Sequence, residues 1–101
     1  MTLLSDADRA ALPPLYATEE QGDAAVVWTR FHAPGTLWQW FAVEFDGEDL
    51  FFGLVCGWDV EAGYFSLSEM EEAGHVIRDA AWRPRSLGDV RVEVDNARAA
   101  L

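Results

Sequence analysis

Residues 36 to 58, TLWQWFAVEFDGEDLFFGLVCGW, contain the strongest fold signal of the chain. Two apolar runs, Thr36 to Phe45 and Leu50 to Trp58, flank the pair Asp46-Gly47. An Asp-Gly pair between apolar runs favours a tight two-residue turn that joins antiparallel strands. We therefore predict a β-hairpin with Asp46 and Gly47 as its central residues.

The register of this hairpin follows from counting outward from the turn. The count places Phe41 opposite Phe52, on a face suited to the core, and it places Glu44 opposite Asp49. Two like charges directly opposite each other destabilise a strand pair by about 0.2–1 kcal/mol. Two alternatives remain open: the real register differs from this count, or an acidic patch is kept at a cost in stability.

Other elements are predicted on both sides of the hairpin. Before it, Ser5 and its acidic neighbours indicate a helix N-terminus, Pro13-Pro14 ends that helix, and Ala24 to His32 has the composition of a strand.

After the hairpin, Gly63 to Leu67 is expected to form a short strand. Overlapping capping boxes predict a short helix that starts near Ser68, and Gly74 is expected to end it. His75 to Trp82 is expected to be another strand.

The segment Gly88 to Asp95 stays ambiguous, because its alternating valines favour a strand while the Ala-rich end favours a helix. Together the elements predict an α+β fold: a mostly antiparallel sheet of four to six strands, a short N-terminal helix and one or two further short helices. At 101 residues, we expect residues 1–101 to form a single domain with one hydrophobic core.

The charge of the chain is strongly one-sided. The formal net charge is −11, all seven basic residues are Arg, and no Lys or Arg lies between Phe31 and Ile77. That central block carries nine carboxylates: Glu44, Asp46, Glu48, Asp49, Asp59, Glu61, Glu69, Glu71 and Glu72. Such a block predicts a negative surface that repels nucleic acid and anionic lipid and attracts basic proteins. The plainer interpretation is a solvated face that keeps the protein soluble.

No combination of residues predicts catalysis, a metal site or a cofactor. Cys56 lies in an apolar, acidic setting that favours a buried structural cysteine over a nucleophile. The two histidines and this cysteine lack zinc-site spacing, and residues 46–49 lack the ligand pattern of a calcium loop. We therefore expect a protein that is not an enzyme. We also expect a cytoplasmic location, because the N-terminal residues lack the apolar core of a signal peptide.

Trp38 and Trp40 are candidates for partner contacts. Aromatic side chains can stack on single-stranded nucleic acid, but that mode requires a cationic groove beside them, and here the neighbours are acidic. We expect no direct nucleic-acid binding. Exposed tryptophans can instead anchor a protein interface, and the alternative is that both rings only cover the second face of the sheet.

Four runs of sequence resemble a known family. These are LPPLYATEE at 12–20, WQW at 38–40, EFDGEDLFFG at 44–53 and GYFSLSEM at 63–70. In this order and spacing they resemble the small bacterial, phage and plasmid proteins grouped as domain of unknown function 2958, over Leu3 to Leu87. The resemblance implies association with mobile elements, assigns no activity, and identifies no functional residue. The segment after Gly88 departs from the usual ending.

Two functions follow as hypotheses. The first is a DNA mimic that inhibits a bacterial restriction nuclease or CRISPR effector, with the nine carboxylates and the two tryptophans as its binding residues. The alternative is an accessory protein-binding module that uses an apolar, Trp-rich surface. Either could act as a monomer or a homodimer.

Overall fold

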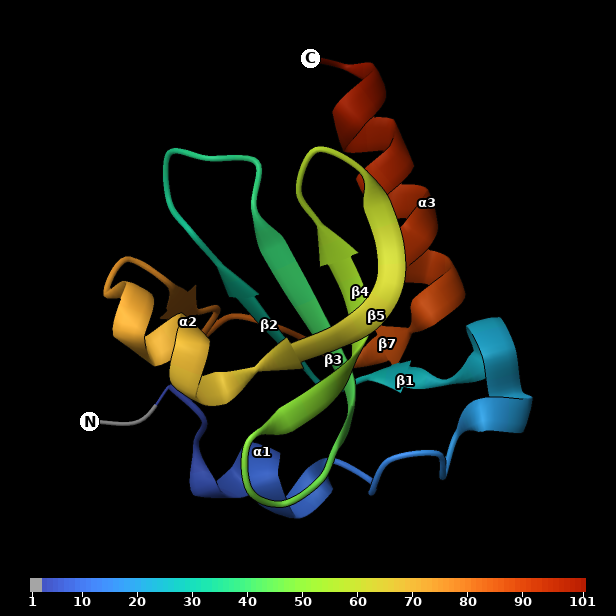
Figure 1. The fold of residues 1–101 in the computed structure, drawn as a ribbon. Coiled ribbons are helices and arrows are strands. Elements are labelled where there is room, and N and C mark those ends of the chain that lie inside the picture. Colours follow the sequence, from blue (N-terminus) through green and yellow to red (C-terminus); the bar gives the residue numbers. More distant parts are fainter. Residues whose placement is uncertain (1–2) are drawn as a thin grey trace.

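The computed structural model describes residues 3–101 and contains a five-stranded antiparallel sheet with strand order β5-β4-β3-β2-β6 (Figure 1). Its strands are β2 (Thr29–His32), β3 (Gln39–Phe45), β4 (Leu50–Cys56), β5 (Val60–Ser66) and β6 (Ile77–Arg78). A second, two-stranded sheet pairs β1 (Val26–Val27) with β7 (Arg85–Ser86). The predicted α+β class is confirmed.

Helical segments lie on both faces and at one end of the sheet. They are α1 (Asp6–Ala11), the 3-10 segment η1 (Glu19–Ala24), α2 (Leu67–Ala73) and α3 (Leu87–Ala99). Ser5 caps α1 and Ser66 caps α2, each accepting a backbone N–H three residues ahead. Gly74 ends α2 in the left-handed conformation, as predicted. In the described part of the chain, no helix is both long and apolar enough to cross a membrane.

The central hairpin exists, but its predicted register is wrong. Phe41 pairs with Leu54 and Ala42 with Gly53, which is a shift of two residues from the count made above. The pairing shifts again between Ala42 and Glu44, where a bulge lies. The loop is longer than two residues, because Asp46 N–H donates to Leu50 O. Glu44 therefore faces Phe52, and the predicted clash with Asp49 does not occur.

Gly53 is required by this pairing. A Cβ atom at Gly53 would lie 1.8 Å from the carbonyl oxygen of Phe41, so the two strands approach too closely for any side chain. Close backbone approach is a common reason for a glycine inside a strand. The glycine thus helps to fix the register of β3 against β4.

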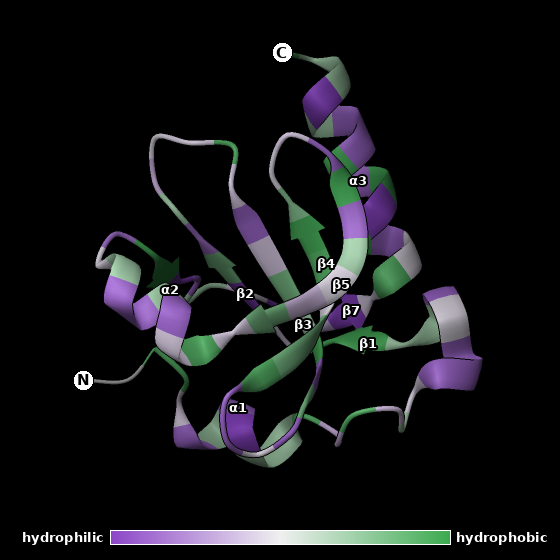
Figure 2. Cartoon of the chain, in the orientation of Figure 1, coloured by the Kyte–Doolittle hydropathy of each residue, from purple (hydrophilic) through white to green (hydrophobic). Residues whose placement is uncertain are grey.

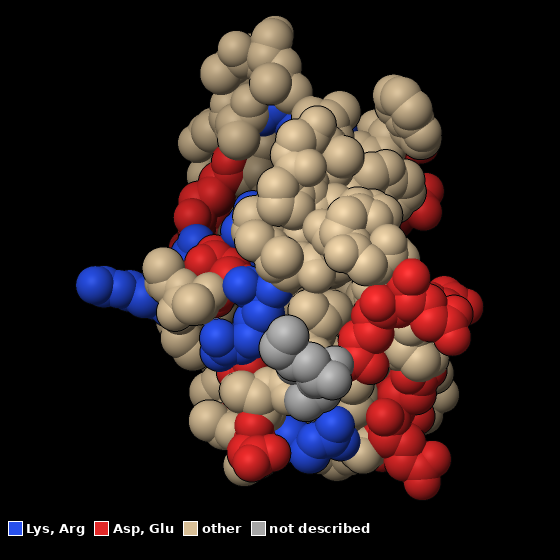
Figure 3. All heavy atoms as spheres, turned by 90° about the vertical axis from the view of Figure 1, so that its left-hand side faces the viewer, with Lys and Arg blue, Asp and Glu red and all other residues tan. Residues whose placement is uncertain are grey.

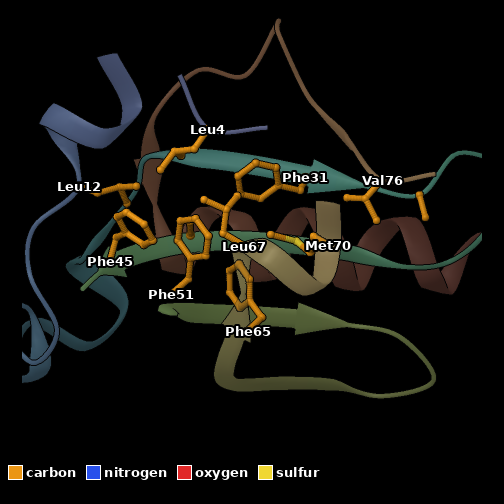
Figure 4. Close-up of a cluster of buried hydrophobic side chains, with 11 residues drawn as sticks. Leu4, Leu12, Phe31, Phe45, Phe51, Phe65, Leu67, Met70 and Val76 are labelled. Atoms are coloured by element: carbon orange, nitrogen blue, oxygen red, sulfur yellow. The ribbon is translucent and has the colours of Figure 1, made fainter. Parts of the chain in front are cut away.

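The sheet divides the hydrophobic core into two clusters. One lies under α2 and includes Phe31, Phe45, Phe51, Phe65 and Met70 (Figure 4). The other lies under α3 and is made of Ala25, Val27, Phe41, Val43, Leu54, Cys56, Leu87, Val90 and Val94. Figure 2 shows the matching pattern. Hydrophobic residues are concentrated in the central strands, and hydrophilic residues alternate with hydrophobic ones along α2 and α3.

Two other predicted strands are shorter in the structure, and the ambiguous segment takes one of its two alternatives. The strand predicted over 24–32 is interrupted at Trp28, so that β1 leaves the main sheet and pairs with β7. The strand predicted over 75–82 is reduced to Ile77–Arg78, because Asp79 begins a turn closed by the bond from Trp82 N–H to its carbonyl. The ambiguous segment after Gly88 is helical and belongs to α3.

Candidate functional site

Six of the nine predicted carboxylates gather along one side of the molecule. The 46–49 loop joins the N-terminus of α2 through Asp49, whose carboxylate accepts from Ser66 Oγ at 2.6 Å and from Ser68 N–H at 2.7 Å. We call this surface the acidic edge and define it as Asp46, Glu48, Asp49, Glu69, Glu71 and Glu72. Figure 3 shows acidic side chains along one margin of the face that bears α2, while Arg side chains lie across from them.

Three of these carboxylates also hold the local structure. Asp46 Oδ1 accepts the N–H groups of Glu48, Asp49 and Leu50 at 2.8–3.0 Å, and Glu71 accepts from Leu3 N–H at 2.8 Å. The bonds from the Glu48 and Asp49 backbone hold the pKa of Asp46 below its usual value, and the bonds from Ser66 and Ser68 lower the pKa of Asp49. Both groups are therefore charged at neutral pH.

No arginine forms an ion pair with the acidic edge within residues 3–101. The four ion pairs there all use carboxylates from outside the 31–77 block, namely Arg30–Asp79, Arg78–Asp8, Arg85–Glu93 and Arg91–Asp23. Arg9 reaches the 46–49 loop, but it donates to the carbonyl of Gly47 and lies over the ring of Phe45. Among the described residues, the acidic edge therefore has no arginine ion pair to balance its negative charge.

The other three predicted carboxylates lie elsewhere. Glu44 is buried, with 3% of its surface exposed, so it does not belong to the protein's surface. Asp59 is exposed in the β4–β5 turn, and Glu61 is exposed on the edge strand β5. The nine residues thus do not form one contiguous patch.

Of the two predicted tryptophans, Trp38 belongs to a second surface at the tips of the loops. Trp58 is 84% exposed and Trp38 is 39% exposed, and together with Leu37 they form what we call the aromatic tip. The Trp38 ring covers Gly57, where a Cβ atom would lie 2.4 Å from it. Trp40 stacks on Trp38 with ring centroids 5.9 Å apart, but it is half-buried against the core and contributes less to the surface.

A third feature has no counterpart in the sequence analysis. A cleft of about 290 Å³ opens between η1, the sheet and α3, and Tyr16, Phe52 and Tyr64 contribute aromatic rings to it. Tyr16 has φ +72°, which is rare for a residue with a side chain. At this cleft the backbone N–H groups of Tyr16 and Thr18 donate to the carboxylate of Glu44, 28 and 26 residues away in sequence. No local motif could therefore have indicated the cleft. We call it the tyrosine cleft.

Cys56 is buried in β4, and burial raises the pKa of its thiol. This placement agrees with a structural cysteine. Among residues 3–101, no three His, Cys, Asp or Glu side chains are grouped so that they could hold a metal ion.

Comparisons with known proteins found no family model, no curated protein and no solved structure that matches this chain. The resemblance to domain of unknown function 2958 stays a prediction from sequence motifs.

Proposed function

We propose that this protein is a non-enzymatic inhibitor whose acidic edge occupies the basic nucleic-acid-binding surface of a bacterial defence nuclease or CRISPR effector. The observation that carries this proposal is the distribution of ion pairs within residues 3–101: four of the seven arginines pair with carboxylates elsewhere, and none pairs with the acidic edge. The resemblance to a mobile-element family adds support by association only.

The charge density of the edge suits such a role. Duplex DNA carries about one negative charge per 1.7 Å of axis, or about six over 10 Å. The seven residues of α2 span about 10 Å and carry three glutamates, about half that density. The 46–49 loop adds three more carboxylates beside the helix N-terminus. An unpaired surface of this kind attracts a basic groove and speeds association.

Charge reversal tests the proposal on the residues that do not hold the fold. The variant Glu48→Lys/Glu69→Lys/Glu72→Lys changes exposed side chains of the edge, whereas Glu44, Asp46 and Asp49 carry internal hydrogen bonds. The matched control, Glu20→Lys/Asp59→Lys/Glu61→Lys, makes the same charge change outside the edge. Circular dichroism and thermal unfolding check that both variants fold.

The measurement is a tagged pull-down from a bacterial lysate, washed at low and then moderate salt, with the partners identified by mass spectrometry. We expect the original protein and the control to retain a nuclease or CRISPR subunit that moderate salt releases, and the edge variant to lose it. Equal retention by the edge variant contradicts the proposal.

The aromatic tip supports a second candidate, an accessory module that binds a protein through an apolar surface. The supporting observation is Trp58, a large apolar side chain that is 84% exposed. Apolar contacts are much less sensitive to salt than charge pairs. A partner that resists moderate salt and is lost in Trp58→Ser, but not in the edge variant, would favour this function.

A further inference from the structure

Glu44 lines the tyrosine cleft with a buried carboxyl group that forms no ion pair with any described residue. Glu44 Oε1 accepts from Tyr16 N–H at 2.8 Å, and Oε2 accepts from Thr18 N–H at 2.8 Å and from Thr18 Oγ at 2.6 Å. No Arg or His nitrogen of residues 3–101 forms an ion pair with it. Buried carboxylates are rare in proteins unless a cation accompanies them.

The only basic residue that lines the described cleft is engaged elsewhere. Arg91 Nε lies 3.1 Å from Asp23 Oδ1, at the rim between α3 and η1. The lining therefore carries three carboxylates, those of Glu19, Asp23 and Glu44, against one guanidinium. Its net charge is negative, so it is complementary to a cation.

Aromatic rings make up part of the remaining lining, and residues such as Ala25, Val43 and Leu87 make up the rest. Tyr64 lies edge-on to Phe52 with ring centroids 5.1 Å apart, and Tyr16 and Tyr64 are 64% and 50% exposed. A hydrogen bond with the Tyr16 side chain raises the pKa of Tyr64, and the charges of Glu44 and Glu19 raise it further. Tyr64 is thus neutral at pH 7, and the ring faces of both tyrosines attract cations.

We propose that the tyrosine cleft binds an arginine side chain presented by a partner protein. A planar guanidinium can stack on tyrosine and donate to carboxylates at the same time, which the compact ammonium of lysine does less well. The cleft, at about 290 Å³, has room for such a side chain.

The proposal does not rest on the function proposed for the acidic edge. The cleft lies on the α3 side of the sheet, and α2 packs on the other side. The two surfaces can therefore be tested separately.

The test is an NMR titration of the ¹⁵N-labelled protein with acetyl-Gly-Arg-Gly-amide. The control peptide contains citrulline, which has the shape of arginine without its charge. We expect saturable shifts at Tyr16, Thr18 and Tyr64 with arginine, and binding weaker by about tenfold with citrulline, the loss of one charge-assisted contact. Equal binding of the two peptides, or shifts confined to the acidic edge, would overturn the proposal.

Cleft variants provide the second measurement. Tyr16→Gly removes an aromatic wall and relieves the positive φ, so the fold is kept. Glu19→Gln removes a lining charge, and Glu20→Gln is its matched control on the same segment. We expect Tyr16→Gly and Glu19→Gln each to weaken arginine binding about fivefold or more. The control Glu20→Gln should bind the arginine peptide as tightly as the original protein does. Unchanged affinity in both cleft variants would refute the assignment.

Discussion

At the scale of single residues, two buried polar side chains of the described chain differ in whether they form hydrogen bonds. Glu44 is buried with three hydrogen bonds, while the buried hydroxyl of Thr29 has no partner. The sequence placed Glu44 in an acidic surface, because its donors are far away along the chain and no local pattern indicates them. A buried hydroxyl without a partner costs free energy that a methyl group would not.

We predict that Thr29→Val raises the free energy of unfolding by about 1 kcal/mol. The matched variant Thr18→Val has the opposite effect and lowers it by about 1.5–3 kcal/mol, because it removes a bond to the buried Glu44 carboxylate. Urea unfolding followed by tryptophan fluorescence measures both. Destabilisation by Thr29→Val would show that the hydroxyl has a partner in solution.

The Asp8–Arg78 ion pair predicts a pH dependence. Burial raises the pKa of Asp8, but the hydrogen bonds and charge of Arg78, together with hydrogen bonding to Ser5, outweigh it, so the pKa is lowered. A carboxylate with a lowered folded-state pKa stabilises the fold above its ordinary pKa of about 3.9, and the stabilisation disappears as pH falls through the folded-state value.

We therefore expect the free energy of unfolding to fall on acidification below about pH 4. The variant Asp8→Asn should be less stable than the original protein at pH 7, and the difference should shrink at pH 2–3. Urea titrations at pH 7, 4 and 2.5 measure this, with Asp6→Asn on the exposed side of α1 as the control. A difference that is constant with pH would argue against a role for the charge of Asp8.

At the scale of elements, the hairpin and α3 show what the sequence could predict. The turn signal identified the correct place and partner strands, but it failed on loop length, because Asp46 binds three backbone N–H groups and holds a wider loop. The bulge before Glu44 and the close approach at Gly53 are long-range effects that no pattern in either strand reveals.

The loop itself yields a prediction about α2. Asp49→Ala should lower the urea midpoint, because Ser68 N–H and Ser66 Oγ lose their acceptor at the start of the helix. Glu48→Ala, one residue away and exposed, should leave the midpoint unchanged. Equal midpoints for the two variants would show that the Asp49 bonds do not stabilise α2.

The valines of α3 distinguish a helix from the strand alternative. In a strand, Val90, Val92 and Val94 would share one face, whereas in α3 Val90 and Val94 are buried and Val92 is 59% exposed. The cap at Ser86, which accepts from Asp89 N–H, was the overlooked signal for a helix.

We predict that Val90→Ala lowers the free energy of unfolding by about 1–3 kcal/mol. Val92→Ala should change it by less than about 0.5 kcal/mol, because it loses little burial and gains helix propensity. Urea unfolding of the two variants measures the contrast. Similar losses at both positions would fit a strand instead.

At the scale of the whole molecule, the net charge and the ion pairs make stability respond to salt in opposite directions. Salt screens the repulsion of a net charge of −11, but it also weakens the four ion pairs. Exposed pairs contribute little, about 0–1 kcal/mol each, whereas all six carboxylates of the acidic edge lie within four residues of another edge carboxylate on the same segment. Repulsion should therefore dominate.

We expect the thermal midpoint to rise when NaCl is raised from 20 to 300 mM. The rise should be smaller in Glu48→Gln/Glu69→Gln/Glu72→Gln, which lacks three charges of the edge, than in Glu20→Gln/Asp59→Gln/Glu61→Gln. Differential scanning calorimetry measures both variants. A midpoint that falls with salt would show that the ion pairs outweigh the repulsion.

The burial of Cys56 has a practical consequence for kinetics. Its thiol lies on a strand with neighbours on both sides and is fully covered, so a thiol reagent in water has no path to it while the sheet is closed. Because it is the only cysteine in the chain, every labelled molecule must have opened that sheet. The labelling rate in plain buffer would thus report how often the native protein opens, without denaturant and without an added probe.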